Sequence, residues 1–169
     1  MSVNIVGSCD LRSVLEQQAE SIPDETFLLF DDCNGGIERY TYGEFNRSVN
    51  RVANGLIKLG VTKGDKVNLH LSNSPELILS WFALAKIGAL MVPTHPSSSA
   101  EELVYLVDQS ESTLVITQPS LVDTVAAIRA TRPELRHIVV IGACSDSGGM
   151  IGFKNLVANQ SEFLPPVPL

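Results

Sequence analysis

Cysteine is scarce in this sequence, and its spacing does not suit a shared thiolate site. The three cysteines, Cys9, Cys33 and Cys144, are odd in number and form no C-x-x-C pair. A disulfide framework or a thiolate metal site is therefore not expected, and a reducing cytoplasm is the favoured compartment. The three histidines, at positions 70, 95 and 137, are equally scattered and form no H-x-x-x-H pair. The sequence accordingly predicts no metal-binding residues.

Positive charge is also sparse. Twelve lysines and arginines stand against 19 aspartates and glutamates, which gives a net charge of −7, and no three basic residues are consecutive. Nucleic acids and anionic membrane surfaces attract basic patches, so neither is an expected partner. The first residues lack a basic segment followed by a long apolar one, so we expect no secretory signal.

The longest apolar run is too short for a membrane span. It covers about 16 residues, Leu77 to Val92, and is interrupted by Lys86 and Gly88, whereas a spanning helix needs roughly 20 apolar residues. We interpret the run as a buried helix followed by the strand "ALMVP" (89–93). A short strand that is apolar on both faces is typical of the centre of a parallel sheet.

Helix and strand patterns alternate along the chain. The region 66–142 has four strand patterns separated by three helix patterns, which predicts a doubly wound, mainly parallel α/β sheet with helices on both faces. Before it, the pattern predicts a helix over 10–21, a β-hairpin with a turn at Asn34-Gly35-Gly36, and a second helix. Thr41 and Glu44 have the spacing of a capping box, which places the start of this second helix.

These elements predict one subdomain over residues 1–164. It comprises a helix-hairpin-helix portion (1–62), a βαβ core (63–142) and a loop with a short helix (143–164), and a Pro-rich linker or truncation point follows at 165–169. Later helix starts are predicted where a serine precedes an acidic residue by three positions: Ser99 with Glu102, and Ser120 with Asp123.

Loops that follow the predicted strands contain polar residues, but no assembled active site. Ser72, Asn73 and Ser74 stand before a helix, where such residues are usually caps rather than an anion site. His95 has no nucleophile or orienting carboxylate at a suitable spacing, so we interpret it as a loop residue.

The remaining candidate sites lack the motif or the neighbouring residues that their chemistry requires. The stretch "GACSDSGG" (142–149) matches neither the phosphate loop G-x-x-x-x-G-K-[ST] nor the dinucleotide fingerprint G-x-G-x-x-G. Cys144 within it has no activating neighbour. Asp31 and Asp32 are far short of a metal coordination set. The sequence therefore predicts no catalytic and no cofactor-binding residue in this chain.

Four short stretches together resemble a known enzyme family. In order they are "YTYGEF" (40–45), "LGVTKGDKV" (59–67), "NSPE" (73–76) and "AKIGALMVP" (85–93). Their order and spacing are similar to the N-terminal part of the adenylate-forming enzymes, which include acyl-CoA synthetases, peptide-synthetase adenylation domains and luciferases. The run 39–93 is most similar to the crotonobetaine/carnitine–CoA ligase branch. The residues that carry the resemblance, which we interpret as structural, are Tyr42, Glu44, Gly64, Asp65, Asn73, Pro75, Glu76, Lys86, Gly88 and Pro93.

The resemblance implies a two-step reaction for a larger parent enzyme. A carboxylate attacks ATP to form an acyl-adenylate, and a thiol, commonly coenzyme A, then takes the acyl group. The family uses a phosphate loop ending in Lys-Gly, an aromatic-Thr-Glu segment for adenine and Mg²⁺, an Asp for the ribose and a lysine on a mobile C-terminal domain. None of these motifs occurs in the 169 residues. Phosphoryl charge has to be met by such groups, so the chain alone is expected to be inactive.

Two hypotheses follow from this comparison. In the first, the chain is the N-terminal fragment of an acyl-CoA ligase; its partner is the remainder of its own enzyme, and ATP, Mg²⁺ and CoA serve only that parent. In the alternative, it is a non-catalytic α/β binding or interaction module that self-associates through exposed apolar surface. A third reading, a nucleotide-binding domain of another kind, requires a phosphate loop that the sequence lacks.

Overall fold

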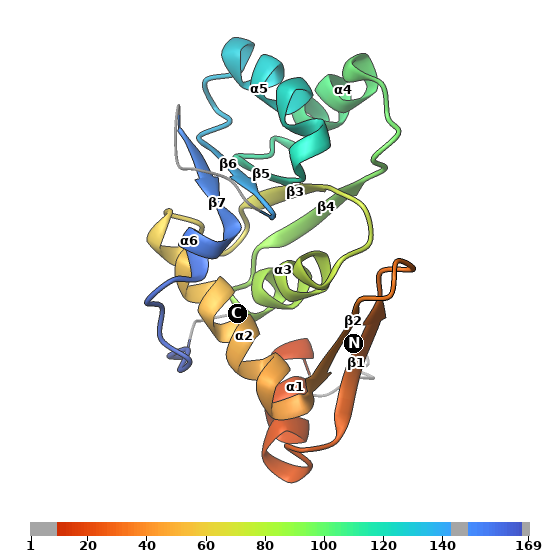
Figure 1. The fold of residues 1–169 in the computed structure, drawn as a ribbon. Helices are drawn as coiled ribbons and strands as arrows, with labels where there is room; N and C mark the ends of the chain where they lie inside the picture. Colours follow the sequence, from red (N-terminus) through yellow and green to blue (C-terminus); the bar gives the residue numbers. More distant parts are fainter. Residues whose placement is uncertain (1–9, 143–148, 167–169) are drawn as a thin grey trace, which may run out of the picture.

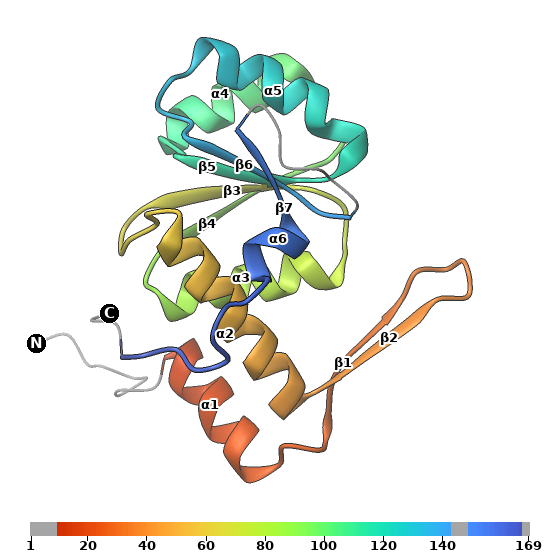
Figure 2. The ribbon, with the colours of Figure 1, turned by 60° about the vertical axis from the view of Figure 1, so that its left-hand side comes forward.

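A five-stranded parallel sheet lies between two layers of helices (Figures 1 and 2). The computed structural model describes residues 10–142 and 149–166. The strands lie in the order β4-β3-β5-β6-β7, and every neighbouring pair is parallel. Their bounds are β3 (Lys66–His70), β4 (Leu90–Thr94), β5 (Leu114–Thr117), β6 (His137–Val140) and β7 (Met150–Gly152).

The strand order reverses at β3, and this reversal distributes the helices over both faces. The chain passes from β3 to β4 on one side and then to β5 on the other side of β3. Helices α1, α2, α3 and α6 pack together on one face, and α4 and α5 cover the other (Figure 2). The helices are α1 (Leu11–Ser21), α2 (Tyr42–Lys58), α3 (Pro75–Lys86), α4 (Ala100–Ser110), α5 (Val122–Thr131) and α6 (Phe153–Val157). The predicted doubly wound α/β fold is confirmed.

The predicted N-terminal helix and hairpin are present, but the hairpin turn differs from the prediction. Strands β1 (Thr26–Asp31) and β2 (Ile37–Thr41) are antiparallel and project from the body of the molecule (Figure 2). The left-handed backbone conformation falls on Cys33 and Gly35, with φ of 59° and 96°, and not on Asn34. The Asp32 carboxylate accepts the N–H groups of Asn34 and Gly36, at 2.7 and 2.8 Å, and these bonds lower the pKa of Asp32. The turn is therefore a longer loop that is organised by an aspartate.

Each face of the sheet has its own hydrophobic core. Alternate residues of β3, Val67 and Leu69, belong to the core under α1, α2, α3 and α6. Val115 of β5 and Ile138 of β6 belong to a smaller core under α4 and α5. Full burial of each such side chain contributes about 1.5–3 kcal/mol of hydrophobic stabilisation.

Two of the three predicted pairs of a serine or threonine with an acidic residue form capping boxes. Thr41 and Glu44 form a capping box at α2, and Ser99 and Glu102 form one at α4. The Glu44 carboxylate accepts the N–H of Thr41 at 2.9 Å, and this bond is the main reason that the pKa of Glu44 is lowered. Gly60 ends the α2 region with φ of 86°, a conformation that glycine adopts without steric cost.

The prediction that "ALMVP" forms the centre of the sheet is wrong. It forms β4, which lies at the edge, and Leu90 is 50% exposed. Leu90 donates its N–H toward β3, to Asp65 O at 2.8 Å. Successive residues of a strand direct their backbone groups to opposite sides, so position 93, three residues further on, faces the open edge. Proline has no N–H to donate and is tolerated at such an edge. An apolar composition alone did not distinguish the two positions.

Three smaller predictions also need correction. The strand β7 follows the predicted Gly/Ser loop and was not expected; residues 143–148 of that loop, including Cys144, lie outside the described part of the chain. Ser120 does not cap α5, which is preceded by a short 3₁₀ turn and has no side-chain cap. The periodicity of the first helix predicts that Leu11, Val14 and Leu15 share a buried face, but in α1 only Leu15 is buried.

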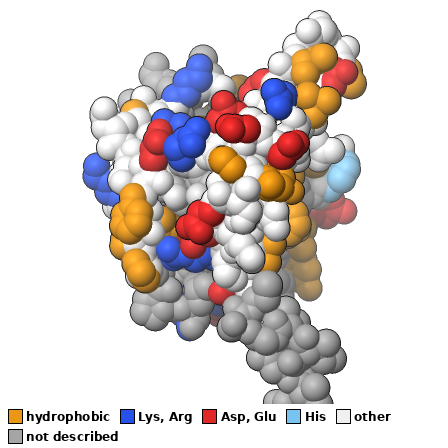
Figure 3. Space-filling view, turned by 90° about the horizontal axis from the view of Figure 1, so that it is seen from below, with side chains coloured by type: hydrophobic (Ala, Val, Ile, Leu, Met, Phe, Trp, Pro, Cys, Tyr) orange, Lys and Arg blue, Asp and Glu red, His pale blue; other side chains and the backbone are white. Residues whose placement is uncertain are grey.

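The surface mixes charges of both signs. Seen from below, acidic and basic side chains lie close together, and hydrophobic side chains reach the surface between them (Figure 3). Among the described residues, no helix is both long and apolar enough to cross a membrane.

Candidate functional site

The ten residues that carry the family resemblance do not meet in one place. Gly64, Asp65 and Gly88 lie where β3 and β4 begin, whereas the loop "NSPE" (73–76) and Pro93 lie where these strands end. Five residues of strand separate the two ends by roughly 16 Å. Tyr42 and Glu44 start α2, and Lys86 ends α3. The structure therefore divides the set between the two edges of the sheet and the helices beside them.

At the amino edge, the glycines fix the turn that starts the sheet. Gly64 donates its N–H to Gly88 O at 2.9 Å, and the two glycines have φ of 88° and 71°. The Asp65 carboxylate accepts the N–H and the hydroxyl of Thr62 at 2.8 and 3.0 Å. These contacts close the turns before β3 and β4 and set the register between the two strands. They explain why glycine and aspartate suit these positions.

The carboxyl edge is where a doubly wound sheet commonly binds ligands, next to the strands at which the order reverses. Here the loops after β3 and β5 are tied together, since Ser72 donates its N–H to the Gln118 side-chain oxygen at 2.7 Å. Ser74 caps α3 by accepting the N–H of Leu77 at 3.2 Å, so Ser74, and not Asn73, fills the predicted capping role. Pro75 occupies the first turn of the same helix.

His95 lies in the loop after β4 and bonds locally. Its Nδ1 accepts the N–H of Ser97 at 3.1 Å. No group of three or more His, Cys, Asp or Glu side chains suited to a metal ion occurs within residues 10–142 and 149–166. The loops 72–74, 95–99 and 118–121 also contain no lysine or arginine. Within the described residues, these three loops thus present hydroxyl and amide groups and His95, and no lysine or arginine for a phosphate.

A buried polar cluster beneath this edge was not predicted. Asn68 and His70 alternate on the face of β3 opposite its leucines and are 0% and 1% exposed. The Thr94 hydroxyl donates to Asn68 Oδ1 at 3.2 Å and lies 3.0 Å from His70 Nδ1. Because the hydroxyl has one proton, His70 Nδ1 is the donor to it. Burial, and then the nearby His95, lower the pKa of His70, so the ring is kept neutral. The alternation of polar residues in "KVNLHL" was the available signal.

Glu76 lines a pocket of about 500 Å³ between the hairpin, α2, α3 and α6. Leu79 and Phe153 form part of its apolar wall. Burial, followed by the charge of Glu38, raises the pKa of Tyr40 at its rim to about 12, so the phenol stays protonated. The cation at the rim, Arg51, pairs with Glu162 at 3.2 Å. Arg51 is therefore already paired with a carboxylate and does not offer a free cation to a phosphate.

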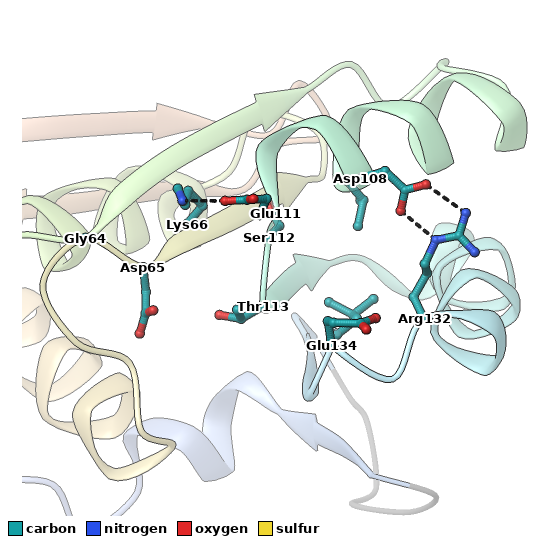
Figure 4. A pocket seen from close by; sticks show the side chains of 11 residues that line it. Gly64, Asp65, Lys66, Asp108, Glu111, Ser112, Thr113, Arg132 and Glu134 are labelled. Carbon is teal, nitrogen blue, oxygen red and sulfur yellow. Dashed lines mark hydrogen bonds and ion pairs between the residues drawn. The ribbon is translucent and has the colours of Figure 1, made fainter.

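A further pocket, of about 550 Å³, opens at the amino edge (Figure 4). Figure 4 shows its two cations engaged by carboxylates: Lys66 Nζ lies 3.0 Å from Glu111, and Arg132 Nε and Nη2 lie 2.5 and 2.7 Å from the two oxygens of Asp108. Both cations are therefore already neutralised within the pocket. This edge also lies opposite the one at which sheets of this kind bind ligands.

Lys86 is the most unusual of the ten residues, because it is a lysine with only 1% of its surface exposed. Its Nζ lies 2.6 Å from Asn46 Oδ1, 2.9 Å from Asn50 Oδ1 and 3.0 Å from Glu16 Oε1. Burial lowers the pKa of Lys86, and Glu16 counteracts that effect. The charge that interrupts the apolar run is thus fully hydrogen-bonded between α1, α2 and α3.

Comparison with known proteins assigns the chain to a family. The sequence model described as "AMP-binding enzyme" matches residues 15–163. A crotonobetaine/carnitine–CoA ligase of Salmonella paratyphi A is 38% identical over 98% of this chain and 32% of its own length. One from Salmonella typhimurium is 37% identical over 99% of this chain and 33% of its own length. The chain thus spans about a third of the curated relatives it matches.

Solved structures agree with this assignment. An anthranilate CoA ligase in complex with anthranoyl-AMP superposes with a TM-score of 0.84 at 26% identity, covering 94% of this chain and 30% of that protein. An acetoacetyl-CoA synthetase from Streptomyces lividans gives 0.84 at 25% identity, covering 94% and 26%. The residues matched by the family model, the sequence identity and the shared fold show that the chain belongs to the AMP-binding, adenylate-forming acyl-CoA ligase family.

Proposed function

We propose that this chain is the N-terminal subdomain of an ATP-dependent acyl-CoA ligase, and that it is the platform on which the rest of the enzyme assembles. The whole enzyme would join a carboxylate to AMP from ATP, with Mg²⁺, and then transfer the acyl group to coenzyme A. The proposed subdomain extends over 1–164, with portions at 1–62, 63–142 and 143–164 and a linker at 165–169. A cytoplasmic location is part of the proposal, supported by the cysteine pattern.

The loops at the carboxyl edge and the pocket at the amino edge do not fit the phosphates of ATP. Triphosphate charge is normally met by lysine, arginine, a metal ion and oriented N–H groups. The loops at the carboxyl edge contain no lysine or arginine, and Lys66 and Arg132 at the amino edge are paired with carboxylates. This supports a division of labour in which ATP and Mg²⁺ are held by the remainder of the enzyme.

One observation carries the platform proposal: a side of α3 that is only partly covered is apolar. It is formed by Leu77, Ile78, Trp81, Phe82 and Ala85, none of which is fully buried, and Trp81 is 43% exposed. These positions share one side of the helix, whereas the solvated side of a helix is normally polar. Another protein surface that covers this side would remove apolar area from water.

The test is ATP–pyrophosphate exchange with a series of carboxylates. We expect none from the chain alone, and exchange when the remainder of the enzyme is supplied as a separate polypeptide. Trp81→Asp should weaken this complementation, whereas Tyr105→Asp, at an aromatic that is 62% exposed on α4, is the matched control and should not. Exchange by the chain alone would refute the platform role. A combined enzyme that is inert with every carboxylate would refute the ligase assignment.

The same apolar side of α3 supports the alternative of a self-associating module. Light scattering separates the two functions. A strictly monomeric chain at high concentration contradicts the module, and a dimer that Trp81→Asp dissociates while complementation fails favours it.

A further inference from the structure

The segment 161–166 runs back over α2 to α1, and it is held mainly by side chains that donate to its backbone carbonyl groups. Asn50 Nδ2 donates to Glu162 O at 2.8 Å. Asn54 Nδ2 lies 2.9 Å from the carbonyl oxygens of both Ser161 and Phe163. Leu164 is 3% exposed and belongs to the larger hydrophobic core. The last described residues therefore form part of the packed domain.

Lys86 connects to this segment through Asn50. The three N–H groups of the lysine ammonium face three acceptors, on Asn46, Asn50 and Glu16, so its bonding capacity is filled. Asn50 uses Oδ1 to accept from Lys86, which leaves its Nδ2 to donate to Glu162 O. The lysine donor and the Glu162 carbonyl thus require the same orientation of the Asn50 amide.

A second connection runs through α1. Glu16 Oε1 accepts from Lys86 Nζ and from Arg12 Nε, both at 3.0 Å. The guanidinium of Arg12 then donates to Leu164 O at 3.0 Å and to Pro165 O at 3.3 Å. The buried lysine is therefore connected to Glu162 O through Asn50, and to Leu164 O and Pro165 O through Glu16 and Arg12.

Ordinary packing does not account for a charge at this position. Removal of an ammonium from water costs several kcal/mol, and an apolar side chain of similar volume would fill the same space without that cost. We propose that Lys86 is a positioning residue: through Asn50 and through Glu16 and Arg12, it orients the donors that fix segment 161–166 on α1 and α2. The inference concerns the chain's own segment and does not depend on the proposed ligase activity. If that activity holds, the same contacts set the direction in which the chain leaves the subdomain.

The test is hydrogen exchange in 160–164, read at the amides of Gln160 and Phe163, which donate to Val157 O at 3.3 Å and to Ser161 Oγ at 3.0 Å, with the amides of β5 as the internal reference. Lys86→Met keeps the volume and removes the donor, so exchange in 160–164 should become about tenfold faster while β5 is unchanged, as expected for the loss of an oriented hydrogen bond. Lys58→Met, at an exposed lysine of α2, is the matched control and should change neither region. A folded Lys86→Met variant with unchanged exchange in 160–164 overturns the proposal.

A second variant keeps the proposal testable if Lys86→Met does not fold. Asn50→Asp retains the acceptor for Lys86 and improves its charge compensation, but it removes the donor to Glu162 O. We expect a folded protein with faster exchange in 160–164 and unchanged exchange in β5. Full protection of 160–164 in Asn50→Asp would show that the connection through Asn50 does not position the segment, and would likewise overturn the proposal.

Discussion

Substitution of Gly55 by alanine should favour the helical conformation of α2 but disrupt its packing against α6. Gly55 lies inside α2 and faces Leu156 of α6. A Cβ atom added to Gly55 would lie 2.5 Å from the carbonyl oxygen of Leu156 and 2.9 Å from its Cγ. The side-chain contact can be relieved by a change of rotamer, but the backbone contact requires α6 to move. The nearby core residues Phe153 and Leu156 would move with it.

Helix propensity and packing change the free energy of unfolding in opposite directions, so the measured sign shows which effect is larger. Alanine is favoured over glycine inside a helix by about 1 kcal/mol. Overpacking of a tight contact costs about 1–3 kcal/mol, and a backbone contact at 2.5 Å belongs to the upper part of that range. We expect a net loss of about 1–2 kcal/mol in the free energy of unfolding, which lowers Tm by roughly 2–8 °C for a domain of this size.

Urea denaturation and thermal unfolding of Gly55→Ala provide the measurement. Gly43→Ala is the graded control in the same helix, since its Cβ would lie 3.1 Å from Pro23 O and should be tolerated better. Addition of Leu156→Ala to Gly55→Ala removes the side-chain contacts but leaves the carbonyl clash, so the Cβ penalty should be relieved only in part. A Gly55→Ala variant that is more stable than the parent would refute the close approach of α2 and α6.

Three further outcomes follow from named contacts. Thr41→Ala should lower the free energy of unfolding by about 1 kcal/mol through loss of the α2 cap, and Thr41→Ser should restore it; equal stability of all three proteins contradicts the cap. Leu164→Ala should cost about 2–5 kcal/mol, whereas Phe163→Ala, at a side chain that is 70% exposed, should cost far less, and equal effects would show that the segment is not docked. Because burial lowers the pKa of His70, the unfolded chain binds the proton more readily than the folded one. The free energy of unfolding should therefore decline as pH falls below the ordinary histidine pKa of 6.5. Urea titrations at pH 7.5 and 5.5 measure this decline, and His70→Gln should make it smaller. An unchanged decline in His70→Gln would exclude His70 as its source.

Features that depend on neighbours in sequence were predictable. The capping boxes at Thr41 and Ser99 involve side chains three residues apart, so a local pattern indicates them, although the same spacing at Ser120 and Asp123 gives no cap. The alternation of strands and helices likewise indicated a parallel sheet. The order of strands depends on contacts between distant residues, and β4 shows the limit. Its apolar residues suited a central strand, whereas Pro93 was the signal for an edge.

The buried polar groups could not have been placed from the sequence. His70 and Asn68 lie on the face of β3 opposite Val67 and Leu69, which an isolated strand would expose to solvent and which the folded chain buries. Lys86 was visible as a single charge in an apolar run, but its partners lie 36 to 70 residues away. A pairing at such separation has no local pattern. The absence of a catalytic site in this chain remains a prediction, which the exchange assay tests.

Four of the ten residues that carry the family resemblance constrain the backbone. Gly64 and Gly88 adopt positive φ and bond to one another, Glu44 completes a cap, and Pro93 occupies an edge position that needs no donor. Each of these roles restricts the residue type without any requirement for reaction chemistry. Lys86 differs from them, because a buried charge is costly and its contacts extend to the last described segment. Backbone geometry therefore does not explain a lysine at position 86, and the proposed connection to segment 161–166 supplies a reason for it.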